Sequence, residues 1–324
     1  MNATAVTVCT WGGLAPGTEE TLTLGRRLSA ACGAPLRWLV LGALPEQGMA
    51  LAGRYGVARV DQIDDPRLAA FQPDVHVEAL AQYCAQQPPT VLLLAQTFDG
   101  RLVAPRLAGR LRSAVVMNAV GVDVGAAGQL LVTASAYGGD TRVVYEVGGS
   151  GPHVLGVMAN ALRPEPCDGA TSGPAVQDVQ VALDGVTERA RVVERATQEG
   201  PRLEDAQVIV AGGRGLGSPE NFKLVEELAA ALGGMAAGSR PIVDEGWVDP
   251  SRQVGLTGKI TRPALYIAAG ISGASQHMVG CAAAKTLVAI NRDADAAVFR
   301  YARYGIVGNC LEILPELIRA VKER

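Results

Sequence analysis

Short, fully apolar runs bounded by turn residues constrain the fold of this chain most. The runs 91–95 and 208–211 are far too short to span a bilayer and are typical of strands buried on both faces of a parallel sheet. Between the strand-like segments 6–9 and 36–41, residues 18–31 open with Thr-Glu-Glu and follow a helical pattern. This alternation predicts an α/β protein with mostly parallel sheets.

Length and charge narrow the function classes. The 324 residues are enough for two domains of ordinary size, and 48% of them are hydrophobic. A net charge of −3 with the signs interspersed gives no basic face for nucleic acid, so a small-molecule or protein partner is favoured. The first residues lack the basic and apolar regions of a secretion signal, which predicts a cytoplasmic protein without direct membrane insertion.

The six cysteines are widely scattered, with no CxxC pair and no histidine at metal-ligand spacing. They are expected to be reduced core thiols, because free cysteine is among the most buried residue types. No metal site is therefore predicted.

The chain changes character twice. Residues 77–84 and 103–111 are predicted helices around a strand at 90–94, and short alternating strands follow at 129–134, 142–146 and 153–158. Residues 163–174 are expected to form an exposed connection, and the charged, weakly patterned stretch 187–203 is typical of a domain boundary. The boundary is placed near Gly200, giving domains 1–199 and 200–324.

The second half restarts the strand–helix rhythm. A strand at 206–211 leads through a glycine turn, 212–217, to a helix that Ser218, Pro219 and Glu220 are expected to begin and that Gly233 and Gly234 stop. Further strands are predicted at 264–268 and 286–291, a helix of small residues after the turn 270–273, and an amphipathic helix at 311–322.

The glycine turn 212–217 lets backbone N–H groups approach a phosphate at a helix N-terminus. Alone it is a weak signal, because it lacks full GxGxxG spacing and an acidic ribose partner, and plain tight packing explains such a turn about half the time. Arg214 within the turn favours phosphate binding, since a guanidinium pairs well with a diphosphate.

Several ordered motifs point to one family. They are Gly238-Ser239-Arg240-Pro241, QVGLTGK at 253–259, RPALYIA at 262–268, GISGASQH at 270–277, AIN at 289–291 and YGIVG at 304–308. Together they resemble the signature of electron transfer flavoprotein alpha subunits of the FixB-like family. The resemblance runs from about residue 208 to 314, and the first half fits the family more loosely.

The resemblance implies a two-domain alpha subunit whose Rossmann-like C-terminal domain binds FAD, while the N-terminal domain carries the interface with a beta subunit. By motif position, the FAD-contacting residues are Arg214, Ser239, Arg240, Val254, Gly255, Leu256, Thr257, Ser272, Gly273, Ala274, Ser275, Gln276, His277, Asn291, Asn309 and Cys310. The family usually has Gln where Leu256 stands, and Asp where Asn309 stands.

Three of these residues are expected to set the redox behaviour. A guanidinium, a hydroxyl and an imidazole aimed at the flavin, from Arg240, Thr257 and His277, would stabilise the anionic semiquinone. His277 adds a full charge only when it is protonated. Without the motif, a satisfied structural histidine would be the better interpretation of His277.

The resemblance implies an electron carrier without substrate chemistry of its own. It would accept electrons from a flavin dehydrogenase, such as one of the acyl-CoA dehydrogenase class, and pass them to a membrane quinone oxidoreductase or another acceptor. Two alternatives stay open. One is an NAD-dependent oxidoreductase of Rossmann type, although no acid–base dyad accompanies the glycine turns; the other is a flavin-depleted scaffold subunit.

Overall fold

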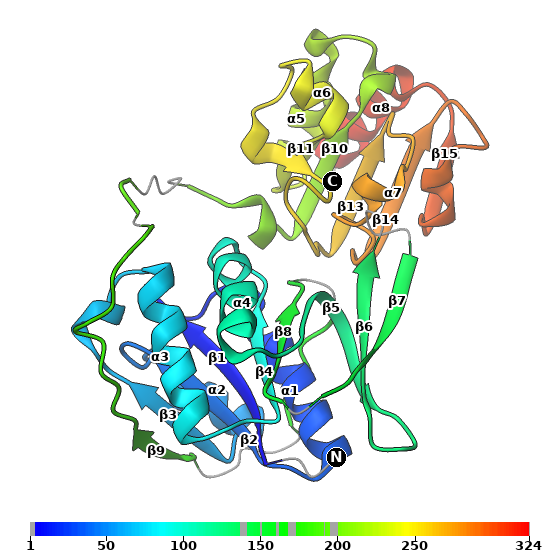
Figure 1. The fold of residues 1–324 in the computed structure, drawn as a ribbon. Helices are drawn as coiled ribbons and strands as arrows, with labels where there is room; N and C mark the ends of the chain where they lie inside the picture. Colours follow the sequence, from blue (N-terminus) through cyan, green and yellow to red (C-terminus); the bar gives the residue numbers. More distant parts are fainter. Residues whose placement is uncertain are drawn as a thin grey trace. The chain divides into compact units, whose positions relative to one another are not determined.

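The computed structural model describes residues 4–136, 141–149, 151–159, 162–167, 173–190, 192–194 and 200–323. The chain divides into two compact units, one formed by residues up to 136 and by 142–196, the other by residues from 197 onward (Figure 1). Residues 168–172 of the predicted exposed connection and 195–199 of the predicted boundary lie outside the described residues. We refer to the two parts as unit 1 and unit 2.

Unit 1 is built on a nine-stranded sheet in the order β7-β6-β5-β8-β4-β1-β2-β3-β9. The strands are β1 (Val6–Trp11), β2 (Leu36–Leu41), β3 (Arg59–Ile63), β4 (Val91–Ala95), β5 (Val115–Val124), β6 (Leu130–Ala136), β7 (Thr141–Val147), β8 (His153–Val157) and β9 (Ala175–Asp178). In this order, every neighbouring pair from β5 to β9 is parallel, whereas β5 and β6 are antiparallel. The prediction of an α/β fold with mostly parallel sheets is confirmed.

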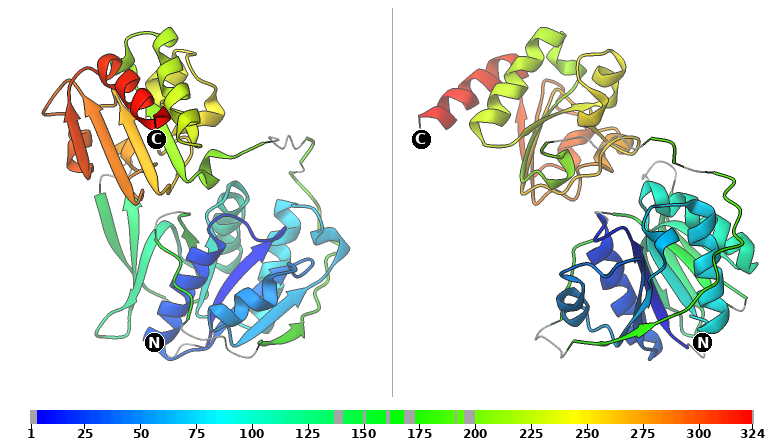
Figure 2. Two further views of the ribbon diagram at one scale, coloured as in Figure 1. Left: turned by 180° about the vertical axis from the view of Figure 1, so that it is seen from behind. Right: turned by 90° about the vertical axis from the view of Figure 1, so that its left-hand side faces the viewer.

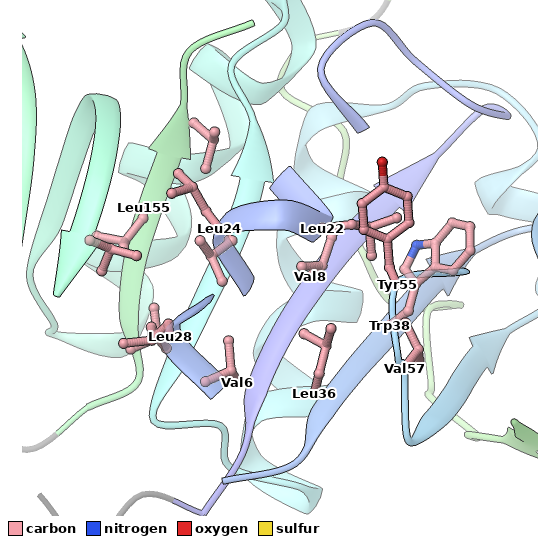
Figure 3. Packing of buried hydrophobic residues seen from close by; sticks show 14 of the residues in the cluster. Val6, Val8, Leu22, Leu24, Leu28, Leu36, Trp38, Tyr55, Val57 and Leu155 are labelled. Atoms are coloured by element: carbon pink, nitrogen blue, oxygen red, sulfur yellow. The ribbon is translucent and has the colours of Figure 1, made fainter. Parts of the chain in front are cut away.

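Two layers of helices cover this sheet (Figure 2). Helices α1 (Thr18–Cys32) and α2 (Gly48–Arg54) contribute to one buried cluster, and α3 (Pro73–Gln86) and α4 (Phe98–Leu111) to the other. Figure 3 shows Leu24 and Leu28 of α1 beside Val6 of β1 and Leu155 of β8, all at most 2% exposed. Each such leucine contributes about 1.5–3 kcal/mol by leaving water.

Helix α1 begins at Thr18 as predicted, whereas α3 and α4 begin earlier than the sequence pattern predicts. Helix α3 begins at Pro73, a residue suited to a first turn because its missing N–H needs no partner there. Helix α4 begins at Phe98, where the Thr97 side chain accepts a hydrogen bond from the backbone N–H of Gly100. Both starts lie in polar stretches, and the apolar periodicity becomes visible only further along each helix.

Unit 2 has a six-stranded sheet, wholly parallel, in the order β12-β11-β10-β13-β14-β15. Its strands are β10 (Val208–Gly212), β11 (Met235–Ser239), β12 (Gln253–Val254), β13 (Leu265–Ala269), β14 (Thr286–Asn291) and β15 (Tyr304–Val307). Helices α5 (Phe222–Ala231) and α8 (Cys310–Lys322) pack on one face with Val210, Ile267 and Ile290. The short helices are α6 (Arg240–Asp244) and α7 (Ser275–Met278).

Two helix predictions in unit 2 are wrong in detail. The Ser218 side chain makes no capping bond, and a 3₁₀ turn, Pro219–Asn221, precedes α5, which begins at Phe222. The predicted stop is confirmed, since Gly234 N–H bonds back to the carbonyl of Ala229. The helix of small residues after Gly273 is one turn, α7, not a full element.

No helix within the described ranges is long and apolar enough to cross a lipid bilayer.

Candidate functional site

A cavity of about 820 Å³ opens at the carboxyl ends of the unit 2 strands. The chain runs from β10 outward to β11 and β12, then returns to the other side of β10 for β13 to β15. The topological switch point therefore lies between β10 and β13, where open α/β sheets bind their ligands. Segments that follow β10, β11, β13 and β14, together with residues 253–257, form the wall.

This cavity brings together 12 of the 16 residues predicted to contact the cofactor. The residues on its wall are Arg214, Ser239, Arg240, Val254, Gly255, Leu256, Thr257, Ser272, Ala274, Gln276, His277 and Asn291. The other four, Gly273, Ser275, Asn309 and Cys310, are not on the wall. All three residues expected to tune the redox behaviour line the cavity.

Glycines let the two loops at the switch point touch backbone to backbone. Gly215 N–H donates to the Gly270 carbonyl oxygen at 3.0 Å, and a Cβ on Gly215 would lie 2.6 Å from the Gly270 Cα. A Cβ on Gly213 would overlap the same carbonyl oxygen. These glycines are thus required for close packing of the loops, because a side chain at either position would overlap the backbone of the other loop.

The segment 253–259 is fastened to α7. Leu256 N–H donates to the Gln276 carbonyl at 2.7 Å, and Gly255 adopts a φ of 138°, a conformation that side chains disfavour. The Gln253 amide donates to the Thr257 hydroxyl at 2.9 Å. Thr257 is thereby held at the cavity, while the apolar Leu256 side chain lies half-buried on the wall.

His277 presents an unmatched polar atom at the cavity. The residue is 8% exposed, and Nε2 lies 3.0 Å from the Tyr266 hydroxyl. When the phenol donates to Nε2 rather than to the neighbouring Cys281 sulfur, the ring's own proton lies on Nδ1. Nδ1 is buried and has no hydrogen-bond partner within the described residues.

Burial lowers the pKa of His277 to about 4. The ring is therefore neutral near pH 7 and does not add the full charge of a protonated imidazole there. With the ring proton on Nδ1, His277 offers the cavity a buried N–H donor.

Two cations of the cavity are without an ion-pair partner. Arg214 and Arg292 line the wall and form no ion pair with any described residue. Arg240, by contrast, bonds the Asp244 carboxylate at 3.2 Å across one helical turn, with 64% of its side chain exposed. The guanidinium groups of Arg214 and Arg292 are thus available to an anionic ligand.

Sequence reasoning missed one part of the wall, the loop that follows β14. Arg292, Asp293, Asp295, Ala296 and Ala297 all line the cavity. A signal was present, because polar residues directly after a buried parallel strand lie at the carboxyl edge of the sheet.

Three of the residues predicted to contact FAD form hydrogen bonds that hold the loops and helix α8 in place. The Asn291 amide donates to the Ile271 carbonyl at 2.9 Å and accepts from Asp293 N–H at 3.0 Å, so it joins the loops after β13 and β14. Asn309 caps α8 by accepting from Leu311 N–H. The Cys310 thiol donates to the Gly215 carbonyl at 3.5 Å, behind the wall.

Within the described ranges, no group of three or more His, Cys, Asp and Glu side chains could hold a metal ion.

Comparisons with known proteins agree with this geometry. The electron transfer flavoprotein domain model matches residues 8–183, and the electron transfer flavoprotein FAD-binding domain model matches residues 202–282. The second match contains the turn after β10, the segment 253–259 and α7. It supports FAD as the cofactor.

Related proteins cover most of the chain. It is 36% identical to electron transfer flavoprotein subunit alpha of Thermoanaerobacterium thermosaccharolyticum, over 83% of this chain and 82% of the relative. It is 36% identical to protein FixB of Clostridium saccharobutylicum, over 94% and 91%, and 34% identical to electron transfer flavoprotein subunit alpha of Bacillus subtilis, over 83% and 82%. The chain therefore belongs to the electron transfer flavoprotein alpha-subunit family.

Proposed function

We propose that this chain is a cytoplasmic electron carrier that holds FAD in the unit 2 cavity and has no substrate chemistry of its own. It takes electrons from a flavin dehydrogenase, such as one of the acyl-CoA dehydrogenase class, and passes them to a membrane quinone oxidoreductase or another acceptor. Residues 1–199 form the interface with a beta subunit, and residues 200–324 form the FAD-binding domain. The observation that carries this proposal is the cavity at the switch point, which gathers the predicted cofactor residues.

The residues of the cavity fit FAD. Backbone contact between Gly215 and Gly270 leaves room for a phosphate to approach main-chain N–H groups, and the free guanidinium groups of Arg214 and Arg292 suit a diphosphate. The unmatched Nδ1–H of His277 suits a carbonyl oxygen of the flavin ring. Arg240 and Thr257 add a charge and a hydroxyl at the same wall. Bound FAD supplies one- and two-electron redox chemistry.

A visible spectrum tests the proposal most directly. The chain co-expressed with a beta subunit should yield a yellow heterodimer with flavin absorption, and the chain alone should be poorly soluble or flavin-depleted. A colourless heterodimer that takes up no added FAD would favour the scaffold alternative. Reduction of bound NAD by a hydride donor would favour the dehydrogenase alternative.

Arg240 gives a prediction about the potential. Replacing Arg240 by Ala removes a permanent positive charge from the wall, so the potential for adding the first electron to bound FAD should fall. Solvent screens the mostly exposed guanidinium, so we expect the one-electron-reduced flavin to lose only about 1.4 kcal/mol of stabilisation. This loss corresponds to a fall of roughly 60 mV in the potential for one electron. Stepwise reductive titration measures this potential.

Arg252→Ala is the matched control, because Arg252 makes a similar surface pair with Glu226 but is not on the wall. Equal shifts in the two variants would mean that Arg240 does not act on the flavin locally.

Leu256 gives a prediction about cofactor retention. A Leu256→Gln variant places an amide on the wall, where one more hydrogen bond to the cofactor is worth about 1 kcal/mol and should slow FAD release several-fold. The backbone bond from Leu256 to Gln276 is unaffected by the change. The rate of FAD loss on dilution or gel filtration measures the effect; faster loss would show that the leucine packs against the cofactor.

A further inference from the structure

A second cavity, of about 470 Å³, lies within unit 1. Its wall includes the end of β1, with Trp11 and Gly12, and the end of β4, with Ala95 and Thr97. The chain passes from β1 to β2 and β3 on one side and returns to the other side of β1 for β4. The cavity is therefore at the topological switch point of unit 1, the place where sheets of this kind bind ligands.

The charges around this cavity disfavour an anion. Helices α1 and α4 both begin beside it, but carboxylates already occupy their first turns, Glu19 and Glu20 in α1 and Asp99 in α4. Among the described residues that line the cavity there is no lysine or arginine. A phosphorylated ligand would lie beside these carboxylates and would contact no lysine or arginine among the described residues of the wall.

His76 gives the cavity a buried hydrogen-bond acceptor. The side chain is fully buried, and its Nδ1 lies 2.9 Å from the Gln72 carbonyl oxygen and 3.4 Å from the Gln72 backbone nitrogen. Because the shorter contact is to an oxygen that can only accept, we place the proton on Nδ1. Burial lowers the pKa of His76 to about 4, which keeps the ring neutral near pH 7. Nε2 is then a bare lone pair, and it has no hydrogen-bond partner among the described residues.

A second orphan acceptor and two aromatic rings accompany His76. The Oε1 atom of Gln72 is also buried without a partner in the described part of the chain. Trp11 and Phe71 line the cavity with nearly parallel rings, their centroids 6.1 Å apart, and each ring contacts His76. Flat apolar surfaces therefore lie beside acceptors that need a donor.

We propose that this cavity binds an uncharged, planar nitrogen heterocycle that presents an N–H donor to His76 Nε2 and stacks against the Trp11 and Phe71 rings. This is a site separate from the FAD cavity, since every residue of its wall belongs to unit 1. The ligand class follows from the acceptors, the aromatic walls and the lack of a lysine or arginine among the described residues of the wall.

Benzimidazole is a suitable probe, because it is flat, neutral near pH 8 and carries one N–H. Its partner probe is 1-methylbenzimidazole, which has the same ring system without that donor. Ligand-observed NMR titration of the FAD-loaded heterodimer should show benzimidazole binding at millimolar concentration and at least tenfold weaker binding of the methylated probe. Equal binding of the two probes, or no binding of benzimidazole, would overturn the proposal, as would tighter binding of benzimidazole-5-carboxylate.

Variants locate the site. His76→Phe keeps an aromatic ring and removes the acceptor, so benzimidazole affinity should fall at least tenfold. His153→Phe is the matched control, because His153 is also a buried histidine of unit 1 but does not line the cavity. Should His76→Phe fail to fold, Ala70→Trp, at an exposed position of the wall, should block binding sterically. Unchanged benzimidazole binding in a folded His76→Phe or Ala70→Trp heterodimer would place the probe elsewhere and refute the assignment.

Discussion

Replacing Gly273 by Ala should destabilise unit 2 by about 3 kcal/mol or more and remove bound FAD. Gly273 has a φ of 83°, where an L side chain costs about 1–2 kcal/mol. In addition, its new Cβ would overlap the backbone nitrogen of Val298, which donates to the Ser272 carbonyl at 3.0 Å. Relief of the overlap would break that bond and shift the loop that carries Ser272 and Ala274 on the cavity wall.

Gly233→Ala is the matched control for this prediction. Gly233 also has a positive φ, 65°, but a Cβ there would meet nothing within 4 Å. Gly233→Ala should lower the free energy of unfolding by only about 1 kcal/mol, because the backbone conformation alone opposes the side chain there. Thermal unfolding and flavin content of the two variants, each co-expressed with the beta subunit, give the comparison. Similar losses in both would mean that the contact with Val298 relaxes without effect on the site.

Most strands that the sequence pattern identifies are buried, and the exposed edge strand β7, predicted at 142–146, is an exception. β1, β2 and β4 are apolar along nearly their whole length, so their neighbours on both faces leave a clear signal. β3 is also largely buried, but the charged residues Arg59 and Asp61 interrupt its apolar pattern. Its Asp61 is fully buried, pairs with Arg59 of the same strand and accepts a hydrogen bond from the Tyr83 hydroxyl of α3 at 2.6 Å. The buried carboxylate is thus satisfied in part by a residue distant in sequence.

Two edge strands, β9 and β12, leave still less signal. All four residues of β9 are exposed, and the strand exists because its backbone pairs with β3 more than 100 residues earlier. β12 has only two residues, held by its register with β11. These strands form because the neighbouring strand offers backbone hydrogen bonds, so their own residues carry no pattern from which they could be predicted.

The cavity in unit 2 was predictable because its residues follow successive parallel strands in short, recognisable segments. The state of His277 was not, because the charge of an imidazole depends on what packs around it. Tyr266 and Val254, two residues beside its ring, belong to other strands. The acceptors of the unit 1 cavity were missed for the same reason, since His76 looks structural in a sequence that shows neither its burial nor its orphan Nε2.

The neutral state of His277 leads to a prediction about acid. Its ordinary pKa of 6.5 applies to the unfolded chain, whereas burial lowers the pKa to about 4 in the folded protein. Below pH 6.5 the unfolded chain therefore binds a proton that the folded chain does not. Stability is complete above this pH and is lost as the pH falls toward 4, by about 3 kcal/mol in total.

Replacing His277 by Gln removes this titration, so the acid-induced loss of stability in unit 2 should shrink by the same amount. Calorimetric unfolding of both proteins between pH 7 and pH 4 measures it. His76, which has a similarly lowered pKa in unit 1, should retain its own acid sensitivity in both proteins and serves as an internal control.

Direct titration of the three histidines by NMR shows whether His277 is neutral or protonated in the folded protein near pH 7. A neutral His277 acts on bound FAD as an N–H donor, so between about pH 6 and 8 the effect of His277→Gln on the first potential should not change with pH. If His277 instead titrates near 6.5, and its effect on the potential fades as the pH rises, the imidazole carries charge in the folded protein. The Tyr266 hydroxyl would then accept from Nε2, and the assignment of the ring proton to Nδ1 alone would be wrong.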